Sequence, residues 1–296
     1  MADAGTLAGA GKSADAARID AHQHFWGLGK VDYPWLTPSH YAAIHRDFEP
    51  EDLEPLLRAA GIAHTITVQA ANSLADTDAM LARADRHAWI AGVTGWIPLL
   101  QPQAAEHALE RYGRHPAFRG VRHLVHDEPD PDWLLRAPVW ESLALVAERG
   151  VVFEIPAVFP RHLIHVPALA EALPALKLVI DHLAKPPIAA GELEPWATQL
   201  AAAATYPNVY AKVSGLNTAA DPERWSAADL LPFVDVALER FGPDRLMFGS
   251  DWPVCLMAGD YEQVWRATLQ VLEGAPRATH DAVLGGTAST LYRLAL

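Results

Sequence analysis

Several features are scarce in this sequence of 296 residues, and each scarcity excludes a class of protein. The single cysteine, Cys255, excludes internal disulfides and favours a reducing compartment such as the cytoplasm. No uninterrupted apolar run reaches the roughly 18 residues of a membrane span. Residues 1–17 lack the basic start and apolar block of a signal peptide. We therefore expect a cytoplasmic protein in which residues 1–17 form a flexible extension.

Positive charge is also scarce. The 23 Lys and Arg are outnumbered by 36 Asp and Glu, so the formal net charge is −13. Phosphate polyanions and acidic membrane surfaces are poor partners for such a chain. We expect a small-molecule partner, with no nucleic acid and no membrane, and the oligomeric state stays open.

A regular alternation of short apolar stretches with amphipathic ones extends over residues 18–296. This alternation predicts parallel βαβ units in a single domain. After a first strand at Ile19, strands are expected at 62–70, 90–97, 118–124, 151–155, 177–182, 209–213 and 246–249. Helices are expected at 51–60, 76–86, 101–114, 139–149, 161–173, 193–204, 227–241, 261–272 and 284–294. Eight units without a glycine-rich phosphate turn after the first strand favour an α/β fold of the (β/α)8 TIM barrel type.

Two histidines mark the end of the first strand. Successive side chains of a strand point to opposite faces, so His22 and His24 share a face and Gln23 points away. The last apolar strand ends in Asp251. Other polar residues at expected strand ends are Arg122, Glu154 and His182. Reactive residues of a barrel lie at the carboxyl ends of its strands, so these side chains are the candidates for one site.

Such a set can act in two ways. With one divalent ion, such as zinc, His22, His24 and His182 supply nitrogen ligands, and Asp251 completes the shell or takes a proton from water. Glu154 is a further candidate ligand. Without a metal, the imidazoles and Arg122 donate hydrogen bonds to a substrate carbonyl while Asp251 acts as general base. Both routes deliver hydroxide to an acyl carbon, and the residues alone leave both open.

Five motifs follow one another at the expected strand ends. They are His-Gln-His-Phe-Trp at 22–26, Gly-Val-Arg-His at 120–123 followed by Asp-Glu-Pro at 127–129, Asp-His-Leu-Ala-Lys-Pro at 181–186, Lys-Val-Ser-Gly-Leu at 212–216, and Phe-Gly-Ser-Asp-Trp-Pro-Val at 248–254. With these motifs the chain resembles the amidohydrolase superfamily, in the branch of sugar-acid lactonases of the L-fuconolactonase and L-rhamnonolactonase type.

The resemblance implies a barrel that hydrolyses a sugar lactone to its hydroxy acid. It implies Asp251 as the base that activates water, the three imidazoles around the reacting carbonyl, and Arg122 as a donor to substrate oxygen. Members with two metals carry a bridging lysine on strand four and a histidine on strand five. Here strand four offers Arg122 and His123 and strand five offers Glu154, so one metal or none is expected. Ala184 stands where glycine is expected.

Further substrate contacts are expected near the strand ends, but several of these residues have structural interpretations as well. A hydroxylated ring needs flat apolar surfaces, which the aromatic-rich segment 27–50 can also supply. Asp251 can serve as a helix cap, and Arg122 can serve as an ion-pair partner. The expected substrate-binding set is His22, His24, Trp26, Glu154, Lys185 and Trp252.

Two rival functions remain. One is a metal-dependent decarboxylase or another amidohydrolase-type hydrolase on the same barrel. The other is a non-catalytic barrel that binds sugar acids without converting them. Replacing Asp251 by Asn separates the catalytic hypotheses from the binding one, because only a catalyst loses turnover while it stays folded.

Overall fold

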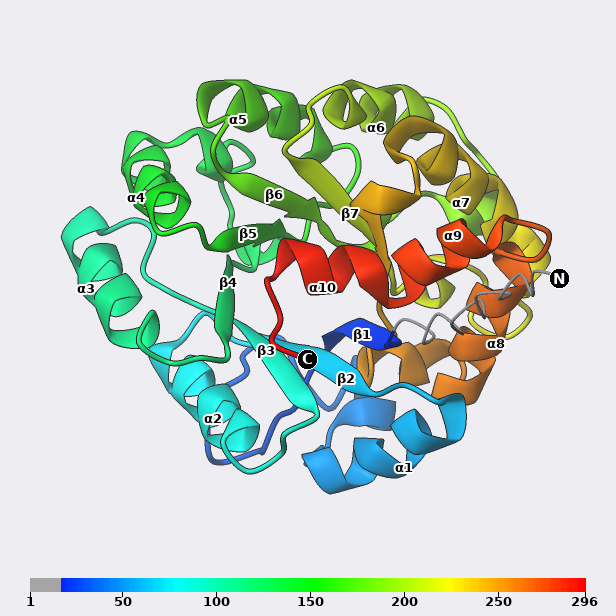
Figure 1. Ribbon diagram of the computed structural model, residues 1–296, viewed down its shortest axis with the longest axis horizontal. Coiled ribbons are helices and arrows are strands. Elements are labelled where there is room, and N and C mark those ends of the chain that lie inside the picture. The colour runs from blue at the N-terminus through cyan, green and yellow to red at the C-terminus, as the bar shows by residue number, and fades with distance from the viewer. Residues whose placement is uncertain (1–16) are drawn as a thin grey trace, which may run out of the picture.

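The computed structural model describes residues 17–296, and eight parallel strands form its centre (Figure 1). Except for Ala17, the expected extension over residues 1–17 lies outside the described residues. The strands pair in chain order from first to last. They are β1 (Ile19–Gln23), β2 (His64–Val68), β3 (Ile90–Gly95), β4 (Phe118–Arg122), β5 (Val152–Ile155), β6 (Lys177–Ile180), β7 (Val209–Val213) and β8 (Leu246–Phe248).

The sheet closes where the last strand meets the first. The backbone N–H of Asp251 donates to the carbonyl of His22 over 2.8 Å, and that of His24 donates to the carbonyl of Trp252 over 2.7 Å. These bonds lie just beyond the end of β8. The predicted (β/α)8 TIM barrel is confirmed, and its closure places the two ends of the domain side by side.

Helices surround the strands on the outside of the barrel, as Figure 1 shows. Each strand's outward face packs against them because the apolar residues of the helices need burial. The helices are α1 (Pro50–Ala60), α2 (Leu74–Ala84), α3 (Pro102–Tyr112), α4 (Ala137–Glu148), α5 (Val166–Ala172), α6 (Trp196–Ala204), α7 (Ala227–Phe241), α8 (Tyr261–Val271), α9 (Arg277–Asp281) and α10 (Thr287–Leu291).

Two expected helices differ from the observed ones. The helix predicted at 161–173 begins only at Val166, because a short 3-10 turn precedes it and Pro167 occupies the first turn. The helix predicted at 284–294 is interrupted by a π turn at Ala282–Gly286, in which Gly285 leaves the helical region. A Cβ at Gly285 would clash with the backbone carbonyl oxygen of Ala17, so this close approach requires glycine. The π turn separates α9 from α10.

The interior of the barrel is closed at its amino-terminal end. Tyr292, just after α10, packs with Ile19, Val152, Val179 and Met247, which lie at or near the starts of their strands. In Figure 1, α10 crosses in front of the strands at this opening. The carboxyl ends of the strands are therefore the open end of the barrel interior.

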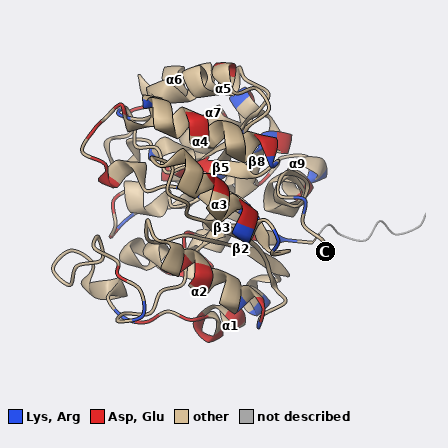
Figure 2. Ribbon diagram, turned by 90° about the vertical axis from the view of Figure 1, so that its left-hand side faces the viewer, with Lys and Arg blue, Asp and Glu red and all other residues tan. Residues whose placement is uncertain are grey.

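The outside of the barrel carries many acidic residues, as expected from the net charge of −13 (Figure 2). Figure 2 shows acidic positions spread over the outer helices and connecting loops. Within residues 17–296, none of the helices has both the length and the apolar character needed to cross a membrane.

Candidate functional site

A cavity of about 300 Å³ opens at the carboxyl ends of the strands. One part of its wall is polar and the other part is apolar or aromatic. The polar lining consists of His24, Arg122, His126, His182, Lys185, Thr218 and Asp251. The apolar and aromatic lining consists of Trp35, Tyr41, Ala70, Leu124, Pro156, Val254 and Met257.

Three imidazoles gather around one carboxylate oxygen at the base of this cavity. Oδ1 of Asp251 lies 3.3 Å from Nε2 of His24, 3.7 Å from Nε2 of His22 and 4.0 Å from Nε2 of His182. The Nε2 atoms of His22 and His24 are 3.2 Å apart. Gln23 points away and donates to the hydroxyls of Thr65 and Thr67. The alternation along β1 thus brings the two imidazoles to one point.

The second nitrogen of each imidazole meets a partner outside the cluster. Nδ1 of His24 lies 2.7 Å from the carbonyl of Val68. Nδ1 of His22 faces a carboxylate oxygen of Asp181 at 3.3 Å, and Nδ1 of His182 is 2.8 Å from the hydroxyl of Ser214. The acceptors at Nδ1 of His24 and His22 favour the tautomer that is protonated at Nδ1, in which the Nε2 lone pair is free. Nε2 atoms with free lone pairs then point at the Asp251 carboxylate.

This donor set fits one divalent cation. Two imidazole nitrogens and a carboxylate oxygen that face one another repel unless a proton or cation lies between them. Ligands about 2.0–2.2 Å from a tetrahedral ion are about 3.3–3.5 Å apart. The spacings among His22, His24 and Asp251 are 3.2, 3.3 and 3.7 Å. These three residues form one group that can hold a metal, and His22, Asp181 and His182 form a second, overlapping group.

The backbone holds the site in an uncommon conformation. Asp251 has φ 58°, and the four residues from His182 to Lys185 all have φ between 49° and 61°. Such left-handed backbone is costly for residues with a side chain and is concentrated at functional sites. Ala184 adopts the left-handed region at φ 61° where glycine was expected, so the turn keeps this shape without glycine. Gly215 is required where it stands, because a Cβ there would lie 2.6 Å from Oδ2 of Asp251.

The pKa values of Asp251 and His182 are both lowered, but for different reasons. Burial would raise the pKa of Asp251, but the neighbouring imidazoles, chiefly His182 and His24, hold that pKa well below its usual range. Burial lowers the pKa of His182 to about 4, although Asp251 opposes the shift. At neutral pH the site therefore combines an ionised carboxylate with a neutral imidazole.

A buried charge network supports the imidazoles from inside the barrel. Nζ of Lys212 lies 2.5 Å from Glu154, 3.2 Å from Nδ1 of His22 and 3.5 Å from Asp181. Nε of Arg122 donates to Asp181 over 2.7 Å. Burial would raise the pKa of Asp181, but the charges of Lys212 and Arg122, together with the neighbouring imidazole of His22, hold it well below its usual value. Each charge in this network has a partner of opposite sign, as burial requires.

The structure separates the candidate site residues into two groups. Asp251, His182, Arg122, His24 and Lys185 line the cavity, whereas the other four do not. His22 lies beneath the lining in contact with His24 and Asp251, as given above. The remaining three lie away from the lining, and they are Trp26, Trp252 and Glu154.

These three residues are buried for structural reasons. Trp26 donates its indole N–H to the carbonyl of Arg46. Trp252 packs edge-on against the ring of Phe48. Glu154 accepts from the hydroxyls of Thr94 and Tyr292 inside the barrel, over 2.7 and 2.6 Å.

Sequence reasoning missed part of the lining. His126 lies in the short turn after β4 and lines the cavity. It was not predicted because it does not stand at the end of a strand. Trp35 and Tyr41 come from the aromatic-rich segment that was expected to form a wall. They contact each other at 5.1 Å between ring centroids, and Trp35 is anchored by a bond from its indole N–H to the carbonyl of Ala70.

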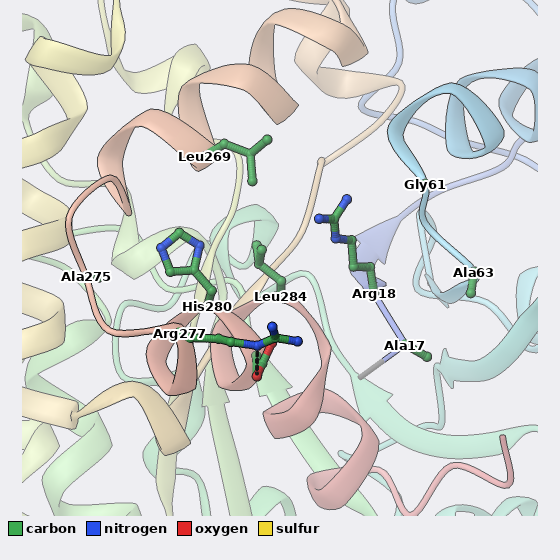
Figure 3. Close-up of a pocket in the computed structure, with 10 residues that line it drawn as sticks. Ala17, Arg18, Gly61, Ala63, Leu269, Ala275, Arg277, His280 and Leu284 are labelled. Atoms are coloured by element: carbon green, nitrogen blue, oxygen red, sulfur yellow. Dashed lines mark ion pairs between the residues drawn. The ribbon is translucent and has the colours of Figure 1, made fainter. Parts of the chain in front are cut away.

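A larger cavity, of about 730 Å³, lies at the other end of the barrel (Figure 3). Its walls come from the segment before β1, the loop after α1, and helices α8 and α9. Among the lining residues within 17–296, the one carboxylate is that of Asp281, which is paired with Arg277 at 3.5 Å, as the dashed line in Figure 3 marks. No cluster of ligands or bases accompanies it among the lining residues, so volume alone does not make it the candidate active site.

Comparison with known proteins gives independent evidence on the family of this chain. The family model described as amidohydrolase matches residues 19–294. A Burkholderia ambifaria protein named L-fucono-1,5-lactonase is 39% identical over 287 residues, which cover 94% of this chain and 96% of that protein. The Comamonas testosteroni 2-pyrone-4,6-dicarboxylate hydrolase is 28% identical over 260 residues, covering 80% of this chain and 77% of that enzyme.

A solved crystal structure is also similar to this chain in its three-dimensional fold. The crystal structure of an amidohydrolase from Burkholderia multivorans with bound zinc is 37% identical to this chain and superposes with a TM-score of 0.87. The match covers 95% of this chain and all of that one. The resemblance inferred from the five motifs is confirmed, and the chain belongs to the amidohydrolase family.

Proposed function

We propose that this protein is a lactonase that opens a sugar-acid lactone, with L-fucono-1,5-lactone as the first candidate. The observation that carries the proposal is the Asp251 carboxylate, which lies 3.3 Å from Nε2 of His24 at the base of an open cavity. A carboxylate and imidazoles at this position suit the activation of water beside an ester carbonyl. The relative named L-fucono-1,5-lactonase, similar over almost the whole chain, supports the choice of substrate class.

In this proposal Asp251 is the general base. It takes a proton from the attacking water, and it can hold that proton until the ring oxygen leaves. Because its pKa lies well below the usual range, Asp251 is a weak base toward ordinary water. The water must therefore be made more acidic, which favours a cation beside the carboxylate.

We propose that one zinc ion is that cation, held by His22, His24 and Asp251, with His182 beside them. A bound divalent ion supplies Lewis acidity, which polarises a carbonyl and lowers the pKa of water. The protein's own residues would orient the side chains that hold this ion. The acceptors at Nδ1 orient the imidazoles, and the Lys212 network keeps His22 in place.

The other lining residues are proposed to bind the substrate. Nε of Arg122 donates to Asp181, and Nη1 donates to the carbonyl of Gln69. The remaining N–H groups of Arg122 are available to donate to a substrate oxygen. His126 and Lys185 offer further polar contacts to hydroxyls. Trp35 supplies a flat apolar face of the kind that sugar rings require.

A panel of lactones assayed with a pH indicator tests the proposal, because each turnover releases a proton. The panel contains L-fucono-, L-rhamnono- and galactonolactone. Acidification with at least one of them, faster than the spontaneous rate and absent with Asp251→Asn, is the expected result. A folded wild-type protein that opens none of them would contradict the assignment.

A second candidate substrate is a lactone that carries a carboxylate. Arg122 and Lys185 line the cavity together, and two cationic side chains suit an anionic substrate. The Comamonas relative is named a hydrolase of a pyrone dicarboxylate. Adding 2-pyrone-4,6-dicarboxylate to the panel separates the two candidates, since preference for it by kcat/KM would favour the anionic class.

A further inference from the structure

A second polar cavity, of about 210 Å³, lies at the amino-terminal end of the barrel beside the last turn of the chain. It is bounded by α3, the start of β4, the loop between α4 and β5, and the residues after α10. Three arginines line it, namely Arg119, Arg149 and Arg293. Three guanidinium groups around one cavity are unusual in a protein with net charge −13.

These guanidinium groups have little compensation within the protein. Arg149 faces Glu106 at 3.7 Å, and that carboxylate is itself 45% exposed. Within residues 17–296, Arg119 and Arg293 have no carboxylate partner, and Nε of Arg119 is buried without a hydrogen-bond partner. The positive charges of these two arginines are therefore not balanced within the protein, and a bound anion would balance them.

The guanidinium of Arg293 lies against the backbone of Gly150 at the edge of this cavity. A Cβ on Gly150 would lie 3.1 Å from Nη1 of Arg293, so the absence of a side chain makes room for that guanidinium. Gly150 itself adopts the left-handed region at φ 63°. Arg293 also has a left-handed backbone, at φ 49°, which is rare for a residue with a side chain and concentrated at binding sites.

We propose that this cavity binds a small oxyanion, such as the phosphate or carboxylate group of a metabolite. Guanidinium groups form charge-assisted hydrogen bonds with both kinds of group. The volume admits a small molecule, and the acidic remainder of the surface disfavours a polyanion such as a nucleic acid. The site is distinct from the cavity that contains Asp251, because the two share no lining residue.

Tyr292 connects this cavity to the interior of the barrel. It lines the cavity, and its hydroxyl donates to Glu154 over 2.6 Å. Glu154 in turn pairs with Lys212, the residue that contacts His22. An occupant of the cavity would therefore contact the residue whose hydroxyl supports the buried network.

Calorimetric titration with inorganic phosphate, and separately with succinate, tests the proposal at constant ionic strength. We expect saturable binding of at least one of them to the wild type. We expect affinity to fall about tenfold or more in Arg293→Asn, because one charged contact of this kind is worth about that much. Asn tolerates the left-handed backbone, so this variant should fold. Arg119→Gln provides an independent second loss of charge.

The matched control is Arg224→Gln, which removes one exposed positive charge from the loop between β7 and α7, at the other end of the barrel and outside the cavity lining. It should bind the anion like the wild type, and all variants should keep lactone hydrolysis. Binding that is absent from the wild type, or equal in Arg293→Asn and the wild type, would overturn the proposal. Binding abolished by a saturating sugar lactone would also overturn it, because the anion would then occupy the Asp251 cavity. Lactone hydrolysis is a separate measurement, so failure of the proposed function and failure of this site are distinguishable.

Discussion

Oδ1 of Asp251 lies 3.3 Å from Nε2 of His24, so the end of the last strand delivers a carboxylate to an imidazole of the first strand. Asp251→Asn keeps the shape of this side chain and removes its capacity to take a proton. We expect kcat for lactone opening to fall about 10²- to 10⁴-fold, the usual contribution of a general base. Initial rates with a pH indicator measure the change.

The control for this variant is Asp221→Asn. Asp221 pairs with Arg224 on the surface, so its loss should leave kcat unchanged. Circular dichroism of both variants should match the wild type. An Asp251→Asn protein that is folded and fully active would show that Asp251 is not the base.

The metal content follows from the spacing of His22, His24 and Asp251. We expect elemental analysis to find about one zinc per chain, because this donor set matches one tetrahedral ion. Dialysis against a chelator should abolish activity, and zinc should restore it. The double variant His22→Ala, His24→Ala should purify with little metal. Full activity after complete chelation would instead support the route in which imidazoles and Arg122 act alone.

The buried ion pair of Lys212 and Glu154 is expected to contribute to the free energy of unfolding. Lys212→Met leaves the Glu154 carboxylate buried without its partner, and such losses cost about 3–5 kcal/mol. The free energy of unfolding, measured by urea titration, should fall by that order. The double variant Lys212→Met, Glu154→Gln should recover part of the loss, because no unpaired charge remains. An equal loss in both variants would mean that packing, and not charge pairing, explains the effect.

Trp35 makes a prediction about substrate binding. Its ring lines the cavity, and Trp35→Leu removes the flat face while keeping an apolar side chain. We expect KM to rise about tenfold with kcat changed little, the pattern of lost uniform binding. Trp140→Leu is the matched control, because Trp140 lies on α4 away from the cavity lining and should leave KM unchanged.

We expect His123 to account for part of the loss of folding stability at acid pH. Its Nδ1 accepts from the indole N–H of Trp96 over 2.9 Å, and its Nε2 lies 2.7 Å from Glu128. Burial lowers the pKa of His123 below the usual 6.5, with Glu128 opposing the shift. The unfolded chain then binds a proton below pH 6.5 that the folded protein does not bind. Stability is therefore complete above pH 6.5 and is lost as the pH falls toward the folded pKa.

Urea titrations between pH 7.5 and 5 measure this effect. His123→Gln should flatten the acid loss by up to about 1.4 kcal/mol per pH unit, the contribution of one proton. The exposed His40 is the control, and His40→Gln should leave the slope unchanged. Identical slopes in the wild type and His123→Gln would refute the assignment.

The sequence alone determined the barrel and predicted the residues that cluster at its candidate site. Strand alternation predicted that His22 and His24 share a face, and the order of strands predicted that Asp251 would reach them. Both follow from local rules, since the side-chain period of a strand and the common direction of parallel strands depend on nearby residues only.

The tertiary structure decided which of the candidate residues line the cavity. Trp26 and Trp252 turned out to pack in the core, and Glu154 turned out to pair with Lys212 inside the barrel. His126, in a turn after β4, joined the lining. Whether a polar side chain faces a cavity or a buried partner depends on charges and loops that come from distant parts of the chain. Those contacts exist only after the barrel closes, which is why inspection of the sequence did not find them.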